Sequence, residues 1–240
     1  MRKALVIGNR YALEMKAGLE KCRFRVFLHT DLKRNDMYDA RDSFIQEKDS
    51  NDVVVFYFSG RGVEYKGEQF LIPCEMEDPK SESQLKFQTM SVDEVIKNIA
   101  KKCNNGLKII ICDSCRSEYN KVLKDISSRV GNVFSSVHSN YHPDEEKQQG
   151  ISKAIDVCIE KVSIVRMNAA SRGETADGGA RTNLSSYTKA LTENLLIPDQ
   201  SLLELKIKMD NVLLDCDANA EITFGNSEEI VATFRYIEKN

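Results

Sequence analysis

Two patterns of apolar and polar positions alternate along the chain, and each predicts a different element. Short runs rich in β-branched and aromatic residues are apolar at odd and even positions alike, which is typical of strands buried between two layers of helices. We therefore expect strands at 3–8, 24–30, 52–59, 107–113 and 162–170.

Segments with apolar residues at helical spacing separate or follow these runs. One of them, 91–103, begins at Ser91 and carries Glu94 three residues later, the pattern of a capping box at a helix start. The other expected helices cover 12–22, 34–48, 185–196 and 201–213, and the run 228–237 is a further strand candidate. Strands and helices in alternation predict a three-layer α/β/α sandwich around a mostly parallel sheet of about six strands.

Length and composition fit one folded domain over residues 1–240. Hydrophobic residues make up 41% of the chain and charged residues 30%, both ordinary for a soluble globular protein. A chain of this size buries enough surface for a single core. Two polar stretches interrupt the pattern, a long loop within 116–160 and the glycine-containing segment 171–183.

Charge and hydropathy exclude several classes of function. A formal net charge of -3 gives no basic footprint for nucleic acid. No run of about 18 apolar residues predicts a membrane span, and Gly8, Asn9 and Arg10 close the first apolar run too early for a signal peptide. We therefore expect a cytoplasmic protein that binds neither nucleic acid nor membrane.

Cysteine usage argues against a disulfide framework. The seven cysteines form an odd set with a single CxxC pair, Cys112 and Cys115, so neither a disulfide framework nor a zinc site with two paired thiolates is indicated. We expect reduced thiols and no bound metal.

Two predicted strands end in residues suited to chemistry. The run "VVVFYFSGRGVEY" breaks at Ser-Gly-Arg-Gly, 59–62, and "IICDSC" ends at Cys115. Ligands of an open α/β sheet bind outside the carboxyl ends of its strands, so 59–62, 113–116 and 171–174 should converge. A cysteine there is a candidate nucleophile. The alternative is an inert, buried thiol.

These segments resemble a known family. "FYFSGRGVEYKGEQFLIP" is similar to the SGHG segment of caspases, metacaspases and paracaspases, and "IICDSCRS" to their D-x-C-R segment. "ALVIGN", "RFRVFLHTDLKRNDMYDARDSF", "AASRGETA" and "SYTKALTENLL" also fit in order, so the resemblance spans nearly the whole chain. The metacaspase and paracaspase branches are closer than caspases proper, because QACRG is absent. The resemblance implies a large-subunit-like part at 1–117, a linker at 118–160 and a small-subunit-like part at 161–240.

The resemblance also implies a role for each matching position. Cys115 matches the nucleophile, and the amides of Gly62 and Cys115 match the donors that stabilise the oxyanion. Asp113, Asp31 and Glu174 match acids of the pocket for the residue before the cut. Converging carboxylates would prefer a peptide or protein with arginine or lysine there.

Arg61 aligns with the family's general acid/base histidine, a departure that decides the expected activity. Cleavage of a peptide by a thiolate needs a proton delivered to the departing amine. Histidine titrates near neutral pH, whereas arginine keeps its proton up to a pKa above about 12. We expect hydrolysis to be very slow or absent, although a fixed cation would favour the thiolate of Cys115. Alternatively, Arg61 forms a surface ion pair with Asp113 or Glu174.

Three histidines could in principle replace the missing one. His29 falls within a predicted strand, and His138 and His142 fall in the polar loop. We expect none of them to act, because acid/base geometry must be held tightly.

Two functions of different class follow. The first is a catalytically impaired regulatory or scaffolding domain that binds basic peptides or pairs, as a homodimer or with an active relative, through 228–237. The second is an active cysteine endopeptidase that cleaves after arginine or lysine. Relatives are often cut in the linker, and Arg129, Lys147 and Lys153 are suitable sites here, but we expect an uncut loop. No cofactor is expected, and calcium dependence, as in many metacaspases, stays open.

Overall fold

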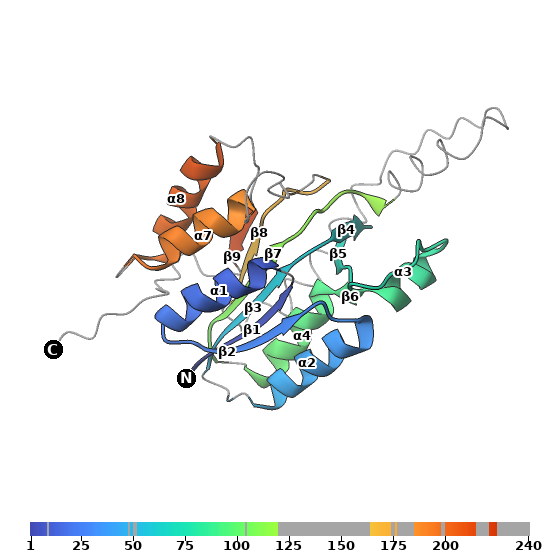
Figure 1. The fold of residues 1–240 in the computed structure, drawn as a ribbon, viewed down its shortest axis with the longest axis horizontal. Helices are drawn as coiled ribbons and strands as arrows, with labels where there is room; N and C mark the ends of the chain where they lie inside the picture. Colours follow the sequence, from blue (N-terminus) through green and yellow to red (C-terminus); the bar gives the residue numbers. More distant parts are fainter. Residues whose placement is uncertain are drawn as a thin grey trace.

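The computed structural model describes residues 1–8, 10–47, 49, 52–103, 105–119, 164–173, 176, 185–197, 200–214 and 221–224. At its centre lies a six-stranded sheet in the order β2-β1-β3-β7-β8-β9 (Figure 1). The five predicted strands are confirmed as β1 (Arg2–Gly8), β2 (Arg25–Thr30), β3 (Val53–Ser59), β7 (Lys108–Asp113) and β8 (Ile164–Asn168), all parallel.

The sixth strand is β9 (Glu221–Phe224), which runs antiparallel to β8. Its four residues place Ile222 and Phe224 at alternate positions, a pattern too short to stand out in the sequence. The predicted strand 228–237 lies outside the described residues. The mostly parallel sheet is thus confirmed, and its antiparallel member comes from a segment that was not predicted.

Helices cover both faces of the sheet, as predicted (Figure 1). The five predicted helices are α1 (Arg10–Lys21), α7 (Ser186–Leu195) and α8 (Leu202–Leu214) on one face and α2 (Arg34–Gln46) and α4 (Val92–Lys102) on the other. The Ser91 half of the predicted capping box is present, since the hydroxyl of Ser91 accepts from the amide of Glu94 at 3.2 Å, and the carboxylate of Glu94 accepts from the hydroxyl of Tyr38 at 3.2 Å.

Alternation along β3 explains the two cores. Tyr57 belongs to the apolar cluster that includes Met15 of α1 and Leu191 of α7, whereas Phe56 belongs to the cluster on the other face, which includes Met37 of α2. Successive strand residues point to opposite faces, so a central strand must be apolar on both. The three-layer α/β/α sandwich is therefore confirmed.

A second, three-stranded sheet begins within the Ser-Gly-Arg-Gly segment and was not predicted. It comprises β4 (Gly62–Tyr65), β5 (Glu68–Leu71) and β6 (Met90–Ser91), and α3 (Glu82–Gln88) lies beside it (Figure 1). Lys66 and Gly67, with φ of 50° and 79°, form the two-residue turn between β4 and β5. Two positive φ values are the mark of a tight hairpin turn. Lysine is uncommon at the first position of such a turn, so the sequence did not predict this hairpin.

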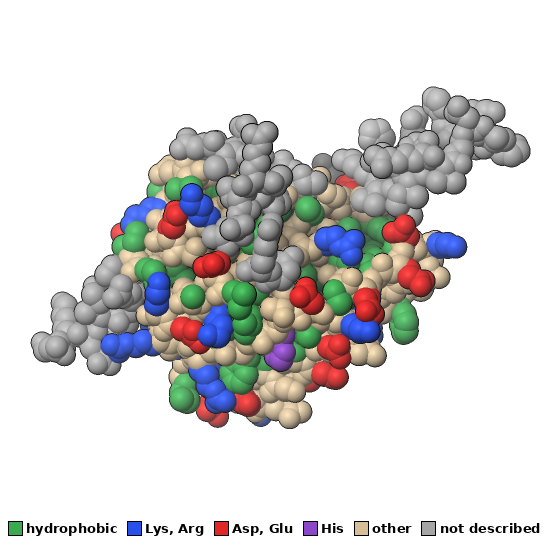
Figure 2. Space-filling view, viewed as in Figure 1, with side chains coloured by type: hydrophobic (Ala, Val, Ile, Leu, Met, Phe, Trp, Pro, Cys, Tyr) green, Lys and Arg blue, Asp and Glu red, His purple; other side chains and the backbone are tan. Residues whose placement is uncertain are grey.

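Within the described residues, no helix has both the length and the apolar character needed to cross a membrane. Side chains of both charge signs are intermixed on the face of the molecule that Figure 2 shows. Recognition of a ligand on this face would therefore depend on local groups rather than on a broad field of one sign.

Candidate active site

The two motif-bearing strands end side by side, as predicted. β3 and β7 are parallel neighbours, with Ser59 opposite Asp113. The amide of Gly60 donates to the carbonyl of Asp113 at 3.1 Å and continues the pairing beyond the strands. The segment after β8 joins them, since the amide of Gly173 donates to the carbonyl of Arg116 at 3.0 Å. Glu174 lies outside the described residues.

Gly62 brings β4 against the cysteine turn at a distance that no side chain permits. A Cβ added at Gly62 would lie 2.7 Å from the carbonyl oxygen of Cys115 and 2.7 Å from Oγ of Ser114. Contacts this short are essentially absent between real atoms, so only glycine fits. Gly62 therefore lies directly against the backbone of Cys115, so the two motifs meet as predicted.

Asp113 is held by the amino end of α7. Its buried carboxylate accepts from the hydroxyls of Ser185 and Thr188, the second at 2.5 Å. Because Thr188 uses its proton on Asp113, the hydroxyl of Tyr57 donates to Thr188, 2.6 Å away. Burial raises the pKa of Tyr57 well above its usual value, which keeps this donor protonated. The Asp113 carboxylate is thus part of a buried hydrogen-bonded chain.

Ser114 and Arg116, on either side of Cys115, are also held by buried partners. Oγ of Ser114 accepts from the amide of Gln69 at 3.2 Å, and Gln69 in turn accepts from Arg166 of β8 at 2.9 Å. The guanidinium of Arg116 binds Glu64 of β4 through Nε at 3.1 Å and Nη2 at 2.9 Å.

Cys115 differs from its neighbours in the turn. Its side chain is half-buried, and the carbonyl oxygen of Ala176 lies 4.0 Å from its sulfur, the outer limit for a thiol hydrogen bond. The turn therefore holds three side chains rigidly and leaves a thiol partly open to solvent. This arrangement suits a positioned nucleophile, whose supporting residues must be locked by packing and hydrogen bonds.

The described cysteines should react with an alkylating agent at rates that follow their exposure to solvent. Cys22, Cys103 and Cys112 are buried, Cys115 is half-buried and Cys74 is exposed. Burial raises the pKa of Cys112 to about 11, and the thiolate is the reacting form. Iodoacetamide at about pH 8 is expected to modify Cys115 and Cys74 and to spare Cys112, as read by peptide mass spectrometry. Urea-unfolded protein is the control, in which Cys112 becomes reactive; modification of Cys112 before Cys115 in folded protein would contradict this placement.

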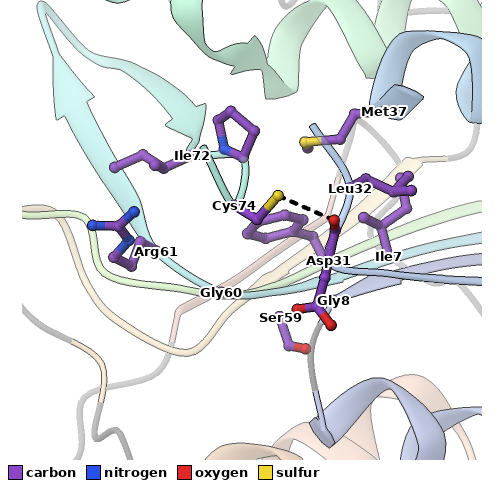
Figure 3. Close-up of a pocket in the computed structure, with 12 residues that line it drawn as sticks. Ile7, Gly8, Asp31, Leu32, Met37, Ser59, Gly60, Arg61, Ile72 and Cys74 are labelled. Carbon is purple, nitrogen blue, oxygen red and sulfur yellow. Dashed lines mark hydrogen bonds between the residues drawn. The ribbon is translucent and has the colours of Figure 1, made fainter. Parts of the chain in front are cut away.

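Arg61 and Asp31 lie together at a cavity of about 170 Å³ over the ends of β1, β2 and β3. Both residues are exposed. Figure 3 shows the Arg61 guanidinium pointing away from Asp31. Asp113 does not line this cavity. The structure therefore places Asp31 and Arg61 at the same cavity and gives Asp113 different neighbours.

The geometry excludes His29 as the partner of Cys115. His29 lies on the edge strand β2, and β1 and β3 separate β2 from β7. Three interstrand spacings of about 4.8 Å put the two strands roughly 14 Å apart. His138 and His142, as well as Arg129, Lys147 and Lys153, lie outside the described residues. No group of three potential metal-ligating side chains occurs in the described part of the chain.

Glu64 and Gln69 of this site escaped the sequence reasoning, and Ser59 lay in the predicted segment 59–62 without an assigned role. Ser59 is buried and lines the cavity with Asp31. Its place in the Ser-Gly-Arg-Gly motif was a usable signal. Gln69 and Glu64 carried no such signal, because the hairpin that positions them was not predicted.

Comparisons with known proteins agree with this architecture. The family model described as caspase domain matches residues 1–223. A solved structure from Geobacter sulfurreducens has 14% sequence identity and a TM-score of 0.63, and the match covers 96% of each chain. Caspase-1 from Spodoptera frugiperda has 12% identity and a TM-score of 0.62, over 100% of this chain and 91% of that one. No curated protein sequence matches. The structural matches support the fold, and the family match establishes that this chain belongs to the caspase domain family.

Proposed function

We propose that this caspase domain is a catalytically impaired peptidase that binds basic peptide segments and acts in regulation or as a scaffold. The observation that carries the proposal is Arg61. It immediately precedes Gly62, whose backbone lies against the Cys115 turn, and it stands where the family resemblance requires a histidine. Cys115 therefore keeps the backbone surroundings that the family resemblance assigns to the nucleophile. The residue at position 61 cannot act as its proton donor.

The chemical reason for impairment is the departing amine. A thiolate can attack a peptide carbonyl, but the tetrahedral intermediate collapses forward only if the amine receives a proton. A guanidinium holds its proton too firmly to deliver it near neutral pH. Losing a proton donor costs about 10² to 10⁴ in rate. The intermediate therefore reverts to the bound, uncleaved peptide. The domain keeps its ability to bind peptide although it has lost its ability to hydrolyse it.

Three features support retained peptide binding. The Cys115 turn is rigid, its thiol is accessible, and the exposed carboxylate of Asp31 is available to a basic side chain. Because buried hydroxyl groups hold the Asp113 carboxylate, Asp31 is the described acid best placed to select arginine or lysine. Glu174 is the second candidate from the motif.

The family branch and the mode of assembly are parts of the same proposal. The segment Asp113-Ser114-Cys115-Arg116 favours the metacaspase and paracaspase branches over caspases proper. β9 is the edge of the described sheet, and an edge strand offers unpaired backbone groups to a partner. Pairing with a second copy or with an active relative through the segment 228–237 is the mode of assembly that we propose.

A turnover assay tests the proposal. Fluorogenic peptides ending in arginine or lysine are incubated with the wild-type protein and with Cys115→Ala. We expect the two rates to be indistinguishable, because the wild type lacks a proton donor. Anisotropy of labelled basic peptides, with Asp31→Asn as the matched variant, should show binding to the wild type that weakens in the variant. Cys115-dependent turnover at ordinary peptidase rates would establish the alternative, an active endopeptidase for basic residues.

A further inference from the structure

One side chain of the small sheet, Gln69 of β5, reaches the residue that precedes Cys115. Its amide nitrogen donates to Oγ of Ser114 at 3.2 Å, and the two residues are 0% and 1% exposed. At this depth water cannot replace a lost partner, so each group depends on the other. The contact therefore fixes the position of Ser114 relative to the hairpin of β4 and β5.

Arg166 of β8 sets the direction of this hydrogen bond. Its Nη2 donates to Oε1 of Gln69 at 2.9 Å, and its Nη1 donates to the carboxylate of Asp93 at 3.4 Å. A guanidinium has donors only, so the oxygen of Gln69 must face Arg166 and the nitrogen must face Ser114. Gln69 thus has one orientation, and it holds Ser114 as an acceptor.

The same hairpin carries the backbone amide of Gly62. Gly62 of β4 pairs with Leu71 of β5, two residues beyond Gln69. A Cβ added at Gly62 would lie 2.7 Å from Oγ and 3.0 Å from Cβ of Ser114, so the glycine lies close against this side chain. Ser114 is therefore held by Gln69 and packed against Gly62 of the same hairpin.

Ser114 also precedes the amide of Cys115, and the two residues share one peptide unit. Because a peptide unit is planar, the direction of its N–H follows the placement of the residue before it. The family resemblance assigns the amides of Gly62 and Cys115 to the oxyanion. Gln69 connects these two donors, since its strand holds Gly62 and its side chain holds Ser114.

We propose that Gln69 is a positioning residue for the oxyanion site, where it keeps the amides of Gly62 and Cys115 directed at one oxygen atom. This rests on the proposed function, in which a peptide binds at Cys115. Hydrogen-bond donors stabilise developing negative charge only when they already point to the place where it forms. A displacement of about 1 Å in such a site can cost roughly a hundredfold in rate.

A peptide aldehyde tests this site without the need to protonate a leaving group. The sulfur of Cys115 adds to the aldehyde carbon, the electron pair of the C=O π bond moves to the oxygen, and the oxygen takes the thiol proton. A hemithioacetal forms and nothing departs. The probe is a peptide that ends in argininal, and the control is the same peptide ending in argininol, which forms no covalent bond. Competition with a labelled basic peptide, read by anisotropy, gives both dissociation constants, and their ratio is the aldehyde preference.

Gln69→Leu and Gln69→Glu form a matched pair. Leucine makes no hydrogen bond to Ser114, and the aldehyde preference should fall by roughly tenfold to a hundredfold. Glutamate keeps the contact with its direction reversed, because the hydroxyl of Ser114 can donate to a carboxylate that also accepts from Arg166. Gln69→Glu should therefore retain most of the preference.

Alkylation by iodoacetamide separates positioning of the amides from general support of the fold. Its reaction with Cys115 takes place at a tetrahedral carbon and forms no oxyanion, so the rate should change much less than the aldehyde preference in Gln69→Leu. Ser114→Ala keeps the test valid if Gln69→Leu does not fold. It removes the other end of the same hydrogen bond, and the double variant should lose no more than either single variant.

The outcomes separate the positioning role from the proposed function. An unchanged aldehyde preference in folded Gln69→Leu and Ser114→Ala would overturn the positioning role and leave the proposed function standing. Equal losses of aldehyde preference and alkylation rate would also overturn it, because Gln69 would then only support the fold around Cys115. A wild type that binds the basic peptide and shows no aldehyde preference would overturn the oxyanion site alone. Absence of binding by every peptide would overturn both.

Discussion

Arg61→His is expected to convert the protein into a measurable, Cys115-dependent peptidase. The Ser-Gly-Arg-Gly backbone already lies against the cysteine turn, so a histidine at position 61 would be placed at the end of β3, next to β7. Its imidazolium can protonate the departing amine and its neutral form can accept a proton from the thiol. Turnover of basic fluorogenic peptides should rise by about 10² to 10⁴ over the wild type.

Two control variants test whether the increase in turnover comes from the histidine and whether it depends on Cys115. Arg61→Gln removes the positive charge without supplying a titratable group, and it should leave turnover at the wild-type level. The double variant Arg61→His/Cys115→Ala should return the rate to background. If Arg61→His folds and binds peptide but stays inactive, then proton donation is not the missing element, and the proposed reason for impairment is wrong.

Removing one member of the Glu64–Arg116 pair is expected to cause the largest loss of stability of any single change near the site. The two side chains are 8% and 3% exposed and lie 2.9 Å apart. Breaking a buried ion pair leaves an uncompensated charge and costs about 3 to 5 kcal/mol. Glu64→Ala should therefore lower the free energy of unfolding by that amount, measured by urea denaturation followed by circular dichroism.

The matched control removes both charges. The double variant Glu64→Gln/Arg116→Met contains no isolated charge, and it should lose less stability than Glu64→Ala alone, because desolvation of the pair largely offsets its attraction. An exposed pair, such as Lys66 with Glu82, should cost about 1 kcal/mol or less when broken. A loss below about 1 kcal/mol for Glu64→Ala would show that water reaches the pair.

The Glu64–Arg116 pair also connects β4 to the turn that carries Cys115. Glu64 and Gly62 belong to β4, and Arg116 follows Cys115 directly. Additional backbone contact comes from the amide of Glu64, which donates to the carbonyl of Ser117 at 3.0 Å. A variant that separates β4 from the turn should therefore also change the alkylation rate of Cys115, whereas Cys74 should react as before.

The central sheet was predictable because each of its five parallel strands has a recognisable apolar pattern within its own short segment. Val54, Val55 and Phe56 are apolar at consecutive positions, and only a strand covered on both faces accommodates such a run. The small sheet was not predictable in the same way. β6 has two residues, and the turn at Lys66 and Gly67 departs from the residues that usually mark a hairpin.

The meeting of the two motifs also followed from local pattern. Two neighbouring parallel strands bring their carboxyl ends to the same edge of a sheet, so the motifs at 59–62 and 113–116 had to approach each other once β3 and β7 were adjacent. The identity of Arg61 then set the chemistry, since the proton affinity of a guanidinium depends little on its surroundings.

The partners that hold the cysteine turn were decided by tertiary structure alone. Gln69, Glu64 and Ser185 reach Ser114, Arg116 and Asp113 across 45, 52 and 72 residues of chain, respectively. A hydrogen bond between residues so far apart leaves no periodic trace in either segment. It forms because packing of β4, β5 and α7 against the sheet excludes water and makes each buried polar group depend on a protein partner. The same packing shapes the cavity beside Arg61, whose walls come from β1, β3, α2, Leu32 and the segment after β5.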